Sequence, residues 1–578
     1  MRAILLSLAL SLTAAAPRAT AEPVRYRLTP ELTGQALTGL QVEIRFPADP
    51  SGTTDLHWDS GWAGEKRLWQ WARDMKVEGA TAVKSEADGH WRITAPPGTP
   101  LIATYRIVSA YDHDPTVEDS EQPRPVIRPD WFYAVGNALF AYPGTRTDVP
   151  ATFDWVGTPG IGFASDLEHL AGQHRKAKRP GTIDDITESS VIGGRDLRLF
   201  PAPDGSGVRV ASVGRYSFSA DQLAQLSRRI IGVERTFWGT DRGAPFLVTA
   251  APLVADPTTS SYGGTGRGDA FALWMDQRMS AEDLKLLLAH EYFHSWNSLR
   301  LRNVDDRGER PRPEYWFSEG FTDYYARALL LRSGLITPEQ FAGMWNTMLA
   351  LYAGSTAKGM TDAQTTTAFW SDQAAGKMPY QRGAMLAALW NARLLAANSD
   401  GRNLDTVLHD QLRRARTARG SAVALFRQSA RAAGLDITAD MQRYLTEGQR
   451  ILLPADTFGS CATIVTEERP VFSRGFDSAA TDKAGNVATG VDPALPAYAA
   501  GLRDGMTILE RVEGEPGNAM RPYALLVDDH GTRRTIRYLP QGQEHETVQR
   551  MELAHPLAAD CRRTLGGLAP ATGKPAKQ

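Results

Sequence analysis

Hydrophobic and polar residues alternate with two different periods along this chain. Between residues 22 and 182 the period is two, most clearly over residues 40–46 and 101–108, and Pro, Gly and Asp separate the segments. Successive side chains of a strand point to opposite faces, so this pattern predicts half-buried strands. We expect residues 22–182 to form an N-terminal β-sandwich-like domain.

The apolar spacing changes to three and four residues over residues 183–455, which we expect to be mainly helical. Ser280 and Asp283 resemble a capping box at the start of one helix. A second helix is expected to end near Arg332, and a third is expected over residues 382–397.

The first 21 residues have the pattern of a cleaved signal peptide. Arg2 precedes a mainly apolar run over residues 3–16, and the small residues of Ala19-Thr20-Ala21 suit a cleavage site. The alternative is an uncleaved anchor, but the run is shorter than the ~20 residues that span a bilayer. We expect export to a bacterial periplasm or secretion, with no membrane association after cleavage.

Composition and charge narrow the function classes. The chain has 578 residues, 42% hydrophobic and 22% charged, which is ordinary for a globular protein of several domains. The formal net charge of −2 gives no electrostatic footprint for nucleic acid, so we expect no such partner.

The chain has two cysteines, Cys461 and Cys561. Both lie in the segment 456–565, where short strands and turns return before a tail, residues 566–578, that we expect to be disordered. In an oxidising compartment the two cysteines are candidates for a disulfide, although their spacing also allows two free thiols. A catalytic role is not expected for either.

His290-Glu291-Tyr292-Phe293-His294 carries the clearest chemistry. Positions i and i+4 share one face of a helix, so both imidazoles can reach one metal ion, with Glu291 beside them as a general base. Zinc favours such nitrogen ligands, and a catalytic zinc site keeps one position open.

Glu319 completes the predicted ligand set, since two His and one Glu form a common catalytic zinc site. It lies on the expected second helix. Asp323 follows four residues later on the same face, where it can orient a zinc-binding histidine. Aromatic residues surround both carboxylates in the sequence, which is unusual for residues of a solvated surface.

These motifs resemble the glycyl aminopeptidase family of gluzincin zinc metallopeptidases. The resemblance rests on residues 290–297 and on Trp316-Phe317-Ser318-Glu319-Gly320-Phe321. It implies an N-terminal β domain, a mainly helical thermolysin-like catalytic domain over residues 183–455 and a C-terminal PDZ-like domain. It also implies one Zn²⁺ per chain and a peptide or protein substrate.

Two further features follow from the resemblance. Tyr380, shortly before Arg382-Gly383-Ala384, matches a tyrosine that stabilises the tetrahedral oxyanion. Tyr262, Gly263 and Gly264 match the start of a substrate-binding stretch.

The sequence departs from the family pattern just after this stretch. Gly266 replaces the glutamate that holds the substrate's amino terminus, and Arg267 replaces the histidine that follows. Arg267 is expected to repel an ammonium group unless Asp269 compensates. The strand expected over residues 271–274 can hold an extended peptide by β-pairing.

The C-terminal segment resembles a bacterial PDZ domain over residues 490–509, with Met506 where an Asp is usual. Its carboxylate-loop candidate, residues 473–476, matches only partly. Peptide capture and a docking or structural role therefore both remain open.

We therefore expect an exported zinc metallopeptidase, an aminopeptidase acting on small N-terminal residues such as Gly or Ala. One alternative is an endopeptidase or dipeptide-releasing peptidase, because the amine-binding glutamate is absent. The other is a non-catalytic PDZ-containing peptide-binding or scaffold protein.

Overall fold

The computed structural model describes two compact units. Its described residues are 22–569 without 60, 63–64, 117–118, 120–122, 146, 171–180, 203–204, 242, 255–260, 298–299, 302–313, 399, 419 and 515. The expected signal peptide and most of the expected tail lie outside them. The first unit comprises residues up to 200 with 209–216 and 245–278, and the second comprises 201–208, 217–244 and the chain from 279.

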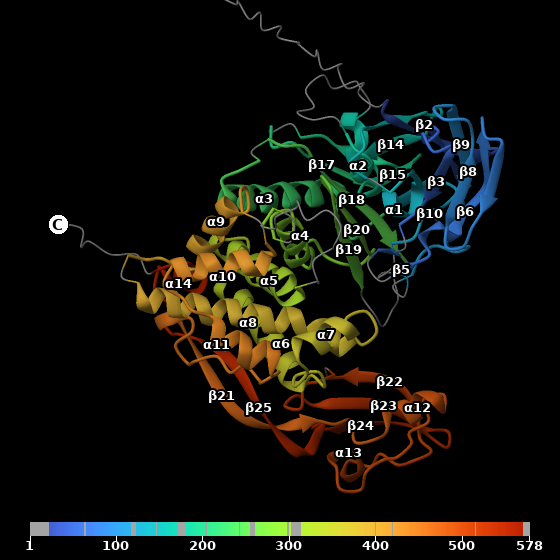
Figure 1. Cartoon of the computed structure of the whole chain (residues 1–578). Coiled ribbons are helices and arrows are strands. Elements are labelled where there is room, and N and C mark those ends of the chain that lie inside the picture. Colours follow the sequence, from blue (N-terminus) through green and yellow to red (C-terminus); the bar gives the residue numbers. More distant parts are fainter. Residues whose placement is uncertain are drawn as a thin grey trace, which may run out of the picture. The chain divides into compact units, whose positions relative to one another are not determined.

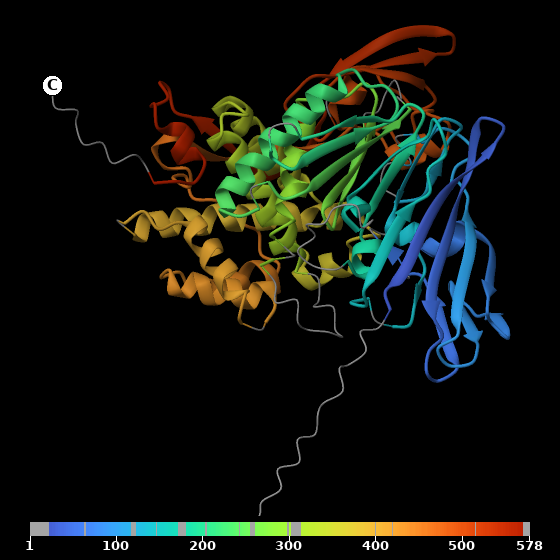
Figure 2. The ribbon, with the colours of Figure 1, turned by 90° about the horizontal axis from the view of Figure 1, so that it is seen from above.

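The first unit consists mainly of β-sheets (Figures 1 and 2). One five-stranded sheet has the order β13-β1-β2-β9-β6 and contains β13 (Ala151–Trp155), β1 (Val24–Thr33), β2 (Ala36–Pro47), β9 (Pro100–Ile107) and β6 (Ala72–Glu78). A four-stranded sheet contains β12 (Tyr142–Pro143), β3 (Thr53–His57), β8 (His90–Thr94) and β7 (Ala82–Ser85). Another contains β10 (Val126–Ile127), β11 (Trp131–Val135), β15 (Ser190–Gly194) and β14 (Gly162–Ser165).

The period-two pattern explains these strands. In β2, Leu40, Val42 and Ile44 are fully buried, whereas the polar residues between them face outward. Strand β2 pairs antiparallel with β1 and β9, and the three share a core of inward-facing apolar side chains. The expectation of an N-terminal sheet domain followed by helices is confirmed.

The strand expected over residues 271–274 is confirmed, since it lies in β20 (Ala270–Asp276). Elsewhere in residues 183–280, the expected helical character is wrong for most of the stretch. It contains a second five-stranded sheet, β16 (Arg198–Phe200), β17 (Val208–Ser212), β18 (Phe246–Leu253), β20 (Ala270–Asp276) and β19 (Tyr262–Arg267), in that order. Strands β18 and β20 pair in parallel and are buried along their whole length. Strands buried on both faces show no alternation, so their period is invisible in the sequence.

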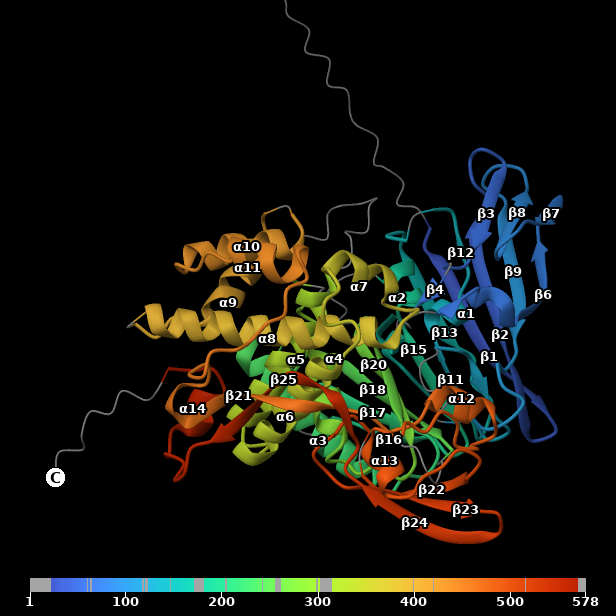
Figure 3. The same cartoon turned by 90° about the horizontal axis from the view of Figure 1, so that it is seen from below.

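The second unit contains the longer helices, whereas the short α1 (Gly136–Leu139) and α2 (Ile183–Thr187) belong to the first. The α-helices of the second unit up to residue 440 are α3 (Ala220–Trp238), α4 (Leu284–Phe293), α5 (Tyr315–Arg332), α6 (Pro338–Gly354), α7 (Asp362–Ala368), α8 (Gln373–Ala397), α9 (Leu404–Arg414), α10 (Ala422–Ala432) and α11 (Thr438–Asp440). Helices α5 and α8 lie side by side (Figures 1 and 3). Helix α8 begins nine residues before the expected start at Arg382, because Asp372 caps its first turn and Pro379 is accommodated inside the helix. In the part of the chain that the structure describes, no helix is long and apolar enough to cross a membrane.

The C-terminal segment belongs to the second unit. A long antiparallel pair, β21 (Ala462–Phe472) and β25 (Gln541–Leu553), packs on α6, where the Asn346 amide exchanges hydrogen bonds with the backbone of Met551. A separate sheet contains β22 (Thr507–Glu513), β23 (Tyr523–Asp529) and β24 (Thr532–Tyr538). The segment also contains the short α-helices α12 (Ser478–Lys483), α13 (Pro496–Ala499) and α14 (Cys561–Leu565).

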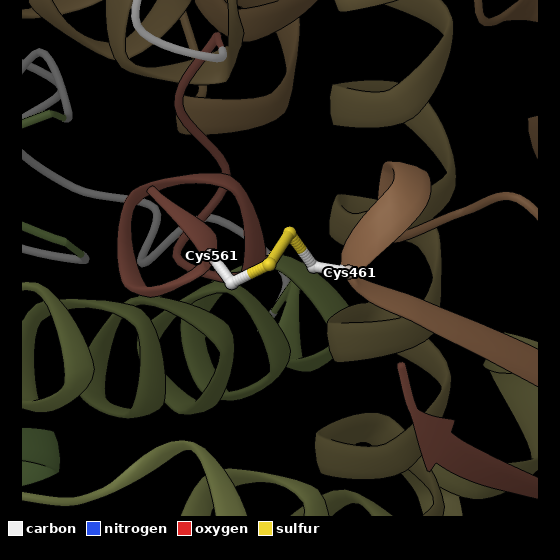
Figure 4. The surroundings of a disulfide bond; sticks show 2 residues. All are labelled: Cys461 and Cys561. Atoms are coloured by element: carbon white, nitrogen blue, oxygen red, sulfur yellow. A yellow bond between two sulfur atoms is a disulfide. The ribbon is translucent and has the colours of Figure 1, made fainter. Parts of the chain in front are cut away.

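A disulfide joins Cys461 to Cys561 (Figure 4), with the two sulfur atoms 2.08 Å apart. The residues just after it are held firmly, although they fall in the expected tail. The Gly567 carbonyl accepts hydrogen bonds from Asn391 on α8 and from Asn403, and Arg332 on α5 donates to the Gly566 carbonyl. The disulfide therefore secures a C-terminal segment that contacts both α5 and α8.

Breaking this disulfide is expected to destabilise the second unit. The bond closes a loop of 100 residues, which corresponds to about 4–5 kcal/mol of chain entropy. Scanning calorimetry should give a lower unfolding temperature for the Cys461→Ala/Cys561→Ala variant and for the reduced wild type. A reductant should leave the double variant unchanged. Equal unfolding temperatures for oxidised wild type and variant would show that the bond contributes nothing.

Candidate metal centre

Helix α4 presents two histidines to one point. His290 and His294 are one turn apart, and their Nε2 atoms are 3.1 Å from each other. His290 is buried and His294 is half-buried, so the point that they face is partly shielded from solvent. This places the two imidazoles as the i, i+4 spacing predicts.

Glu319 from α5 brings a carboxylate to the same point. Its Oε2 is 3.3 Å from the Nε2 atoms of both His290 and His294. A tetrahedral ion with ligands at ~2.0–2.1 Å holds its ligand atoms about 3.3–3.4 Å apart. The three distances, and the two nitrogens and one oxygen that they join, therefore fit a zinc ion.

Asp323 lies behind this group, one helical turn from Glu319. Its Oδ1 is 3.1 Å from Nδ1 of His290, so the other ring nitrogen of His290 faces Glu319. Arg327, a further turn along α5, forms an ion pair of 2.8 Å with the second oxygen of Asp323. A carboxylate behind a ligating histidine fixes the ring and its tautomer. Sequence reasoning missed Arg327, although its i+4 spacing from Asp323 was a usable signal.

The charges of these groups depend on one another. Burial alone would lower the pKa of His290, but hydrogen bonds with Asp323 and Glu319 outweigh it and raise the pKa to about 10. Burial would raise the pKa of Asp323, but Arg327 and His290 lower it to about 2. The pKa of Glu319 falls far below its ordinary value because the histidines outweigh its burial. Without metal, His290 therefore carries a proton that a bound cation has to displace.

Tyr380, from α8, lies against the same centre. Its ring stacks near that of His290, with the centroids 5.6 Å apart. Burial, followed by the negative charges of Glu319, Glu291 and Asp323, raises the pKa of its hydroxyl well above 10. Tyr380 thus keeps its proton at neutral pH and can act as a donor.

A pair of glycines sets the distance between α5 and α8. Gly320 follows Glu319, and Gly383 is one turn after Tyr380. A Cβ atom on Gly383 would lie 1.8 Å from the Trp316 carbonyl oxygen, and one on Gly320 would lie 2.3 Å from the Gly383 Cα. Any side chain at either position would separate the two helices, so the approach of Tyr380 to Glu319 depends on both glycines.

Asn297 joins the end of the α4 segment to the start of α5. Its fully buried side-chain amide donates to the carbonyls of Phe317 and Ser318 and to the Thr322 hydroxyl, at 3.0–3.1 Å. These acceptors flank Glu319 along the helix. The sequence motif includes Asn297, but its partners lie 20 to 25 residues away and gave no local signal.

The predicted substrate-binding residues Tyr262, Gly263 and Gly264 lie in β19 of the first unit, and their role stays a prediction. Arg267, at the end of β19, is buried and donates to the Asn137 side chain and the Thr187 carbonyl. Its guanidinium also lies over the Trp62 ring, 4.6 Å from the centroid. All these contacts lie within the first unit; both hydrogen bonds come from Nη2, and Nε and Nη1 are buried without a hydrogen-bond partner among the described residues.

A family model described as M61 glycyl aminopeptidase matches residues 283–386 of the chain. The matched stretch contains His290, Glu291, His294, Glu319 and Tyr380. The match supports a metallopeptidase. No curated protein matches the sequence.

A solved structure shows a similar fold over nearly the whole chain. An aminopeptidase N family protein from Idiomarina loihiensis is 15% identical and gives a TM-score of 0.65, covering 95% of this chain and 100% of its own. An M1 zinc metallopeptidase from Deinococcus radiodurans is 17% identical with a TM-score of 0.45, covering 75% of this chain and 94% of its own. The first of these likenesses indicates a shared architecture.

Replacing Gly383 by Ala is expected to weaken the metal centre. The added methyl group would push α8 away from α5, and disturbed supports of metal ligands typically lower metal affinity about 10–100-fold. Competition with a chromophoric zinc chelator measures this change.

Gly343→Ala is the matched control. A Cβ atom there has no heavy atom within 4 Å, and the residue lies inside α6. This change should leave zinc affinity unaltered and stabilise the helix by about 0.5–1 kcal/mol. Wild-type zinc affinity in Gly383→Ala would contradict the role assigned to the glycine pair.

Proposed function

We propose that this protein is a zinc-dependent peptidase that removes small residues such as Gly or Ala from the amino termini of peptides. The proposal rests chiefly on the convergence of His290, His294 and Glu319, whose ligand atoms are 3.1–3.3 Å apart. The carboxylate of Asp323 behind His290 adds support, because a carboxylate in this position orients a metal-binding histidine. An ion pair without a metal does not require it.

Each residue of the site has a separate role in peptide hydrolysis. His290, His294 and Glu319 would hold one Zn²⁺, which supplies a Lewis acid. Glu291, half-buried on the same helix, takes a proton from the attacking water and passes it to the leaving amine. The protonated Tyr380 hydroxyl donates a hydrogen bond to the oxygen on which negative charge develops.

Cleavage inside peptides, or release of dipeptides, is the second candidate. It is favoured by Gly266, which has no carboxylate to hold a substrate's ammonium group. Arg267 does not decide between the two, because its side chain is buried within the first unit, where it donates to Asn137 and Thr187 and lies over Trp62.

Export to the periplasm or secretion is part of the proposal. The disulfide between Cys461 and Cys561 supports it, since such bonds persist in oxidising compartments. A PDZ-like peptide-binding role for residues 456–565 stays a prediction, and so does the non-catalytic scaffold alternative. A PDZ domain binds its peptide as a strand added to the edge of a sheet. Here helix α12, and not a strand, follows the carboxylate-loop candidate over residues 473–476, which favours a structural role for this segment.

Substituting Glu291 by Gln is expected to remove peptidase activity while leaving zinc in place. The amide keeps the size of the side chain but cannot accept the water's proton, and general bases contribute about 10²–10⁴-fold. Metal analysis should give one zinc per chain for both proteins. Equal activity, or a wild type without stoichiometric zinc, would overturn the mechanism.

Peptides with free and acetylated amino termini separate the two candidate activities. An aminopeptidase recognises the ammonium group of its substrate. The acetylated form of a peptide that begins with Gly or Ala should therefore be cleaved at least about 100-fold more slowly, because the groups that recognise the ammonium are left unpaired. Mass spectrometry of the products measures both rates. Efficient cleavage of acetylated peptides would establish internal cleavage and exclude the aminopeptidase.

A further inference from the structure

A row of aromatic rings leads from the metal centre to the surface. Tyr380 stacks near His290, and the Phe369 ring lies beyond it, 6.4 Å between centroids and tilted by 19°. Tyr315 stacks on Phe369 at 3.9 Å. Trp370 closes the row, with its ring edge-on to Phe369 at 4.9 Å.

The outer rings of this row reach solvent. Tyr315 and Phe369 are half-buried, and Trp370 is 62% exposed, the highest value for a large apolar side chain among the described residues. Single exposed apolar residues are common on proteins. This one differs because it continues a stack that begins at a predicted zinc ligand.

The position of Trp370 is fixed by its neighbours. The turn between α7 and α8 is short, and Ser371 and Asp372 both donate backbone hydrogen bonds to the Ala368 carbonyl. The Trp370 side chain also interacts with the Tyr315 hydroxyl and lowers its pKa, against the larger raising effect of burial. The outer end of the row is thus preorganised, which lowers the entropy cost of binding.

The aromatic rings of the row determine which peptide side chains can bind there. Aromatic faces bind apolar and aromatic side chains, and each aromatic pair contributes about 0.5–1.5 kcal/mol beyond its area. Charged groups lie at the inner end of the row: the exposed Lys377, whose Nζ lies 5.7 Å from the centroid of the Tyr380 ring, and Glu319 beside the Tyr380 hydroxyl.

We infer that Phe369 and Trp370 form a specificity subsite for a bulky, uncharged apolar side chain of the peptide, on one side of the cleaved bond. The inference rests on the proposed peptidase function. It assigns a substrate class to the same site. A peptide with a small residue on one side of the cleaved bond can still carry a large residue on the other side.

The test compares peptides with Ala, Leu or Phe placed on either side of the cleaved bond. Wild type should prefer Leu and Phe at one of the two positions. Trp370→Ala should lower kcat/KM for those peptides about tenfold and leave the Ala peptides within twofold. Trp370→Phe should retain most of the preference. Leu351→Ala, which removes another exposed apolar side chain from α6, is the control and should change neither value.

Binding gives a readout that does not depend on turnover. In the Glu291→Gln background, calorimetry should give an about tenfold weaker Kd for the Phe peptide after Trp370→Ala, with unchanged zinc content. A uniform loss for all peptides, or no loss, would overturn the subsite while leaving the peptidase intact. A wild type that cleaves no peptide would refute the proposed function itself, and the subsite with it.

Discussion

The contact between α5 and α8 at Gly320 and Gly383 is the constraint on which the site depends. Helix α5 contributes Glu319 and Asp323, and α8 contributes Tyr380. Without side chains at the two glycines, the helix backbones touch, with a Cβ on Gly383 excluded by the Trp316 carbonyl. A ligand carboxylate and a phenol donor reach the histidines of α4 because this contact is so close.

The electrostatics of the site follow from the same geometry. Three carboxylates, from Glu291, Glu319 and Asp323, lie near two imidazoles in a largely buried volume, and Arg327 balances only Asp323. The excess negative charge favours a proton on His290 and a proton on Tyr380. A divalent cation would replace the first proton and leave the second available as a donor. The same excess of negative charge therefore favours binding of a cation by the histidines and Glu319 and keeps the Tyr380 hydroxyl protonated.

The sequence predicted the parts of this site that lie on α4 and α5, where the functional residues follow helical spacing. His290, His294, Glu319 and Asp323 could be placed because helical spacing sets which side chains share a face. The contact of Gly320 with Gly383 joins residues that are far apart along the chain, so no local pattern reveals it. The burial of Arg267 is a similar case, since its partners Asn137 and Thr187 are 130 and 80 residues away. Strand β18 was missed because it is buried along its whole length and shows no alternation. The start of α8 at Gln373, after the Asp372 cap, was missed as well.

Anomalous diffraction at the zinc edge, from crystals grown with zinc, locates the metal itself. We expect one strong peak per chain, about 2.0–2.1 Å from Nε2 of His290, from Nε2 of His294 and from a carboxylate oxygen of Glu319. A map with no peak among these three side chains, or with its zinc bound elsewhere on the chain, would show that they do not form a zinc site.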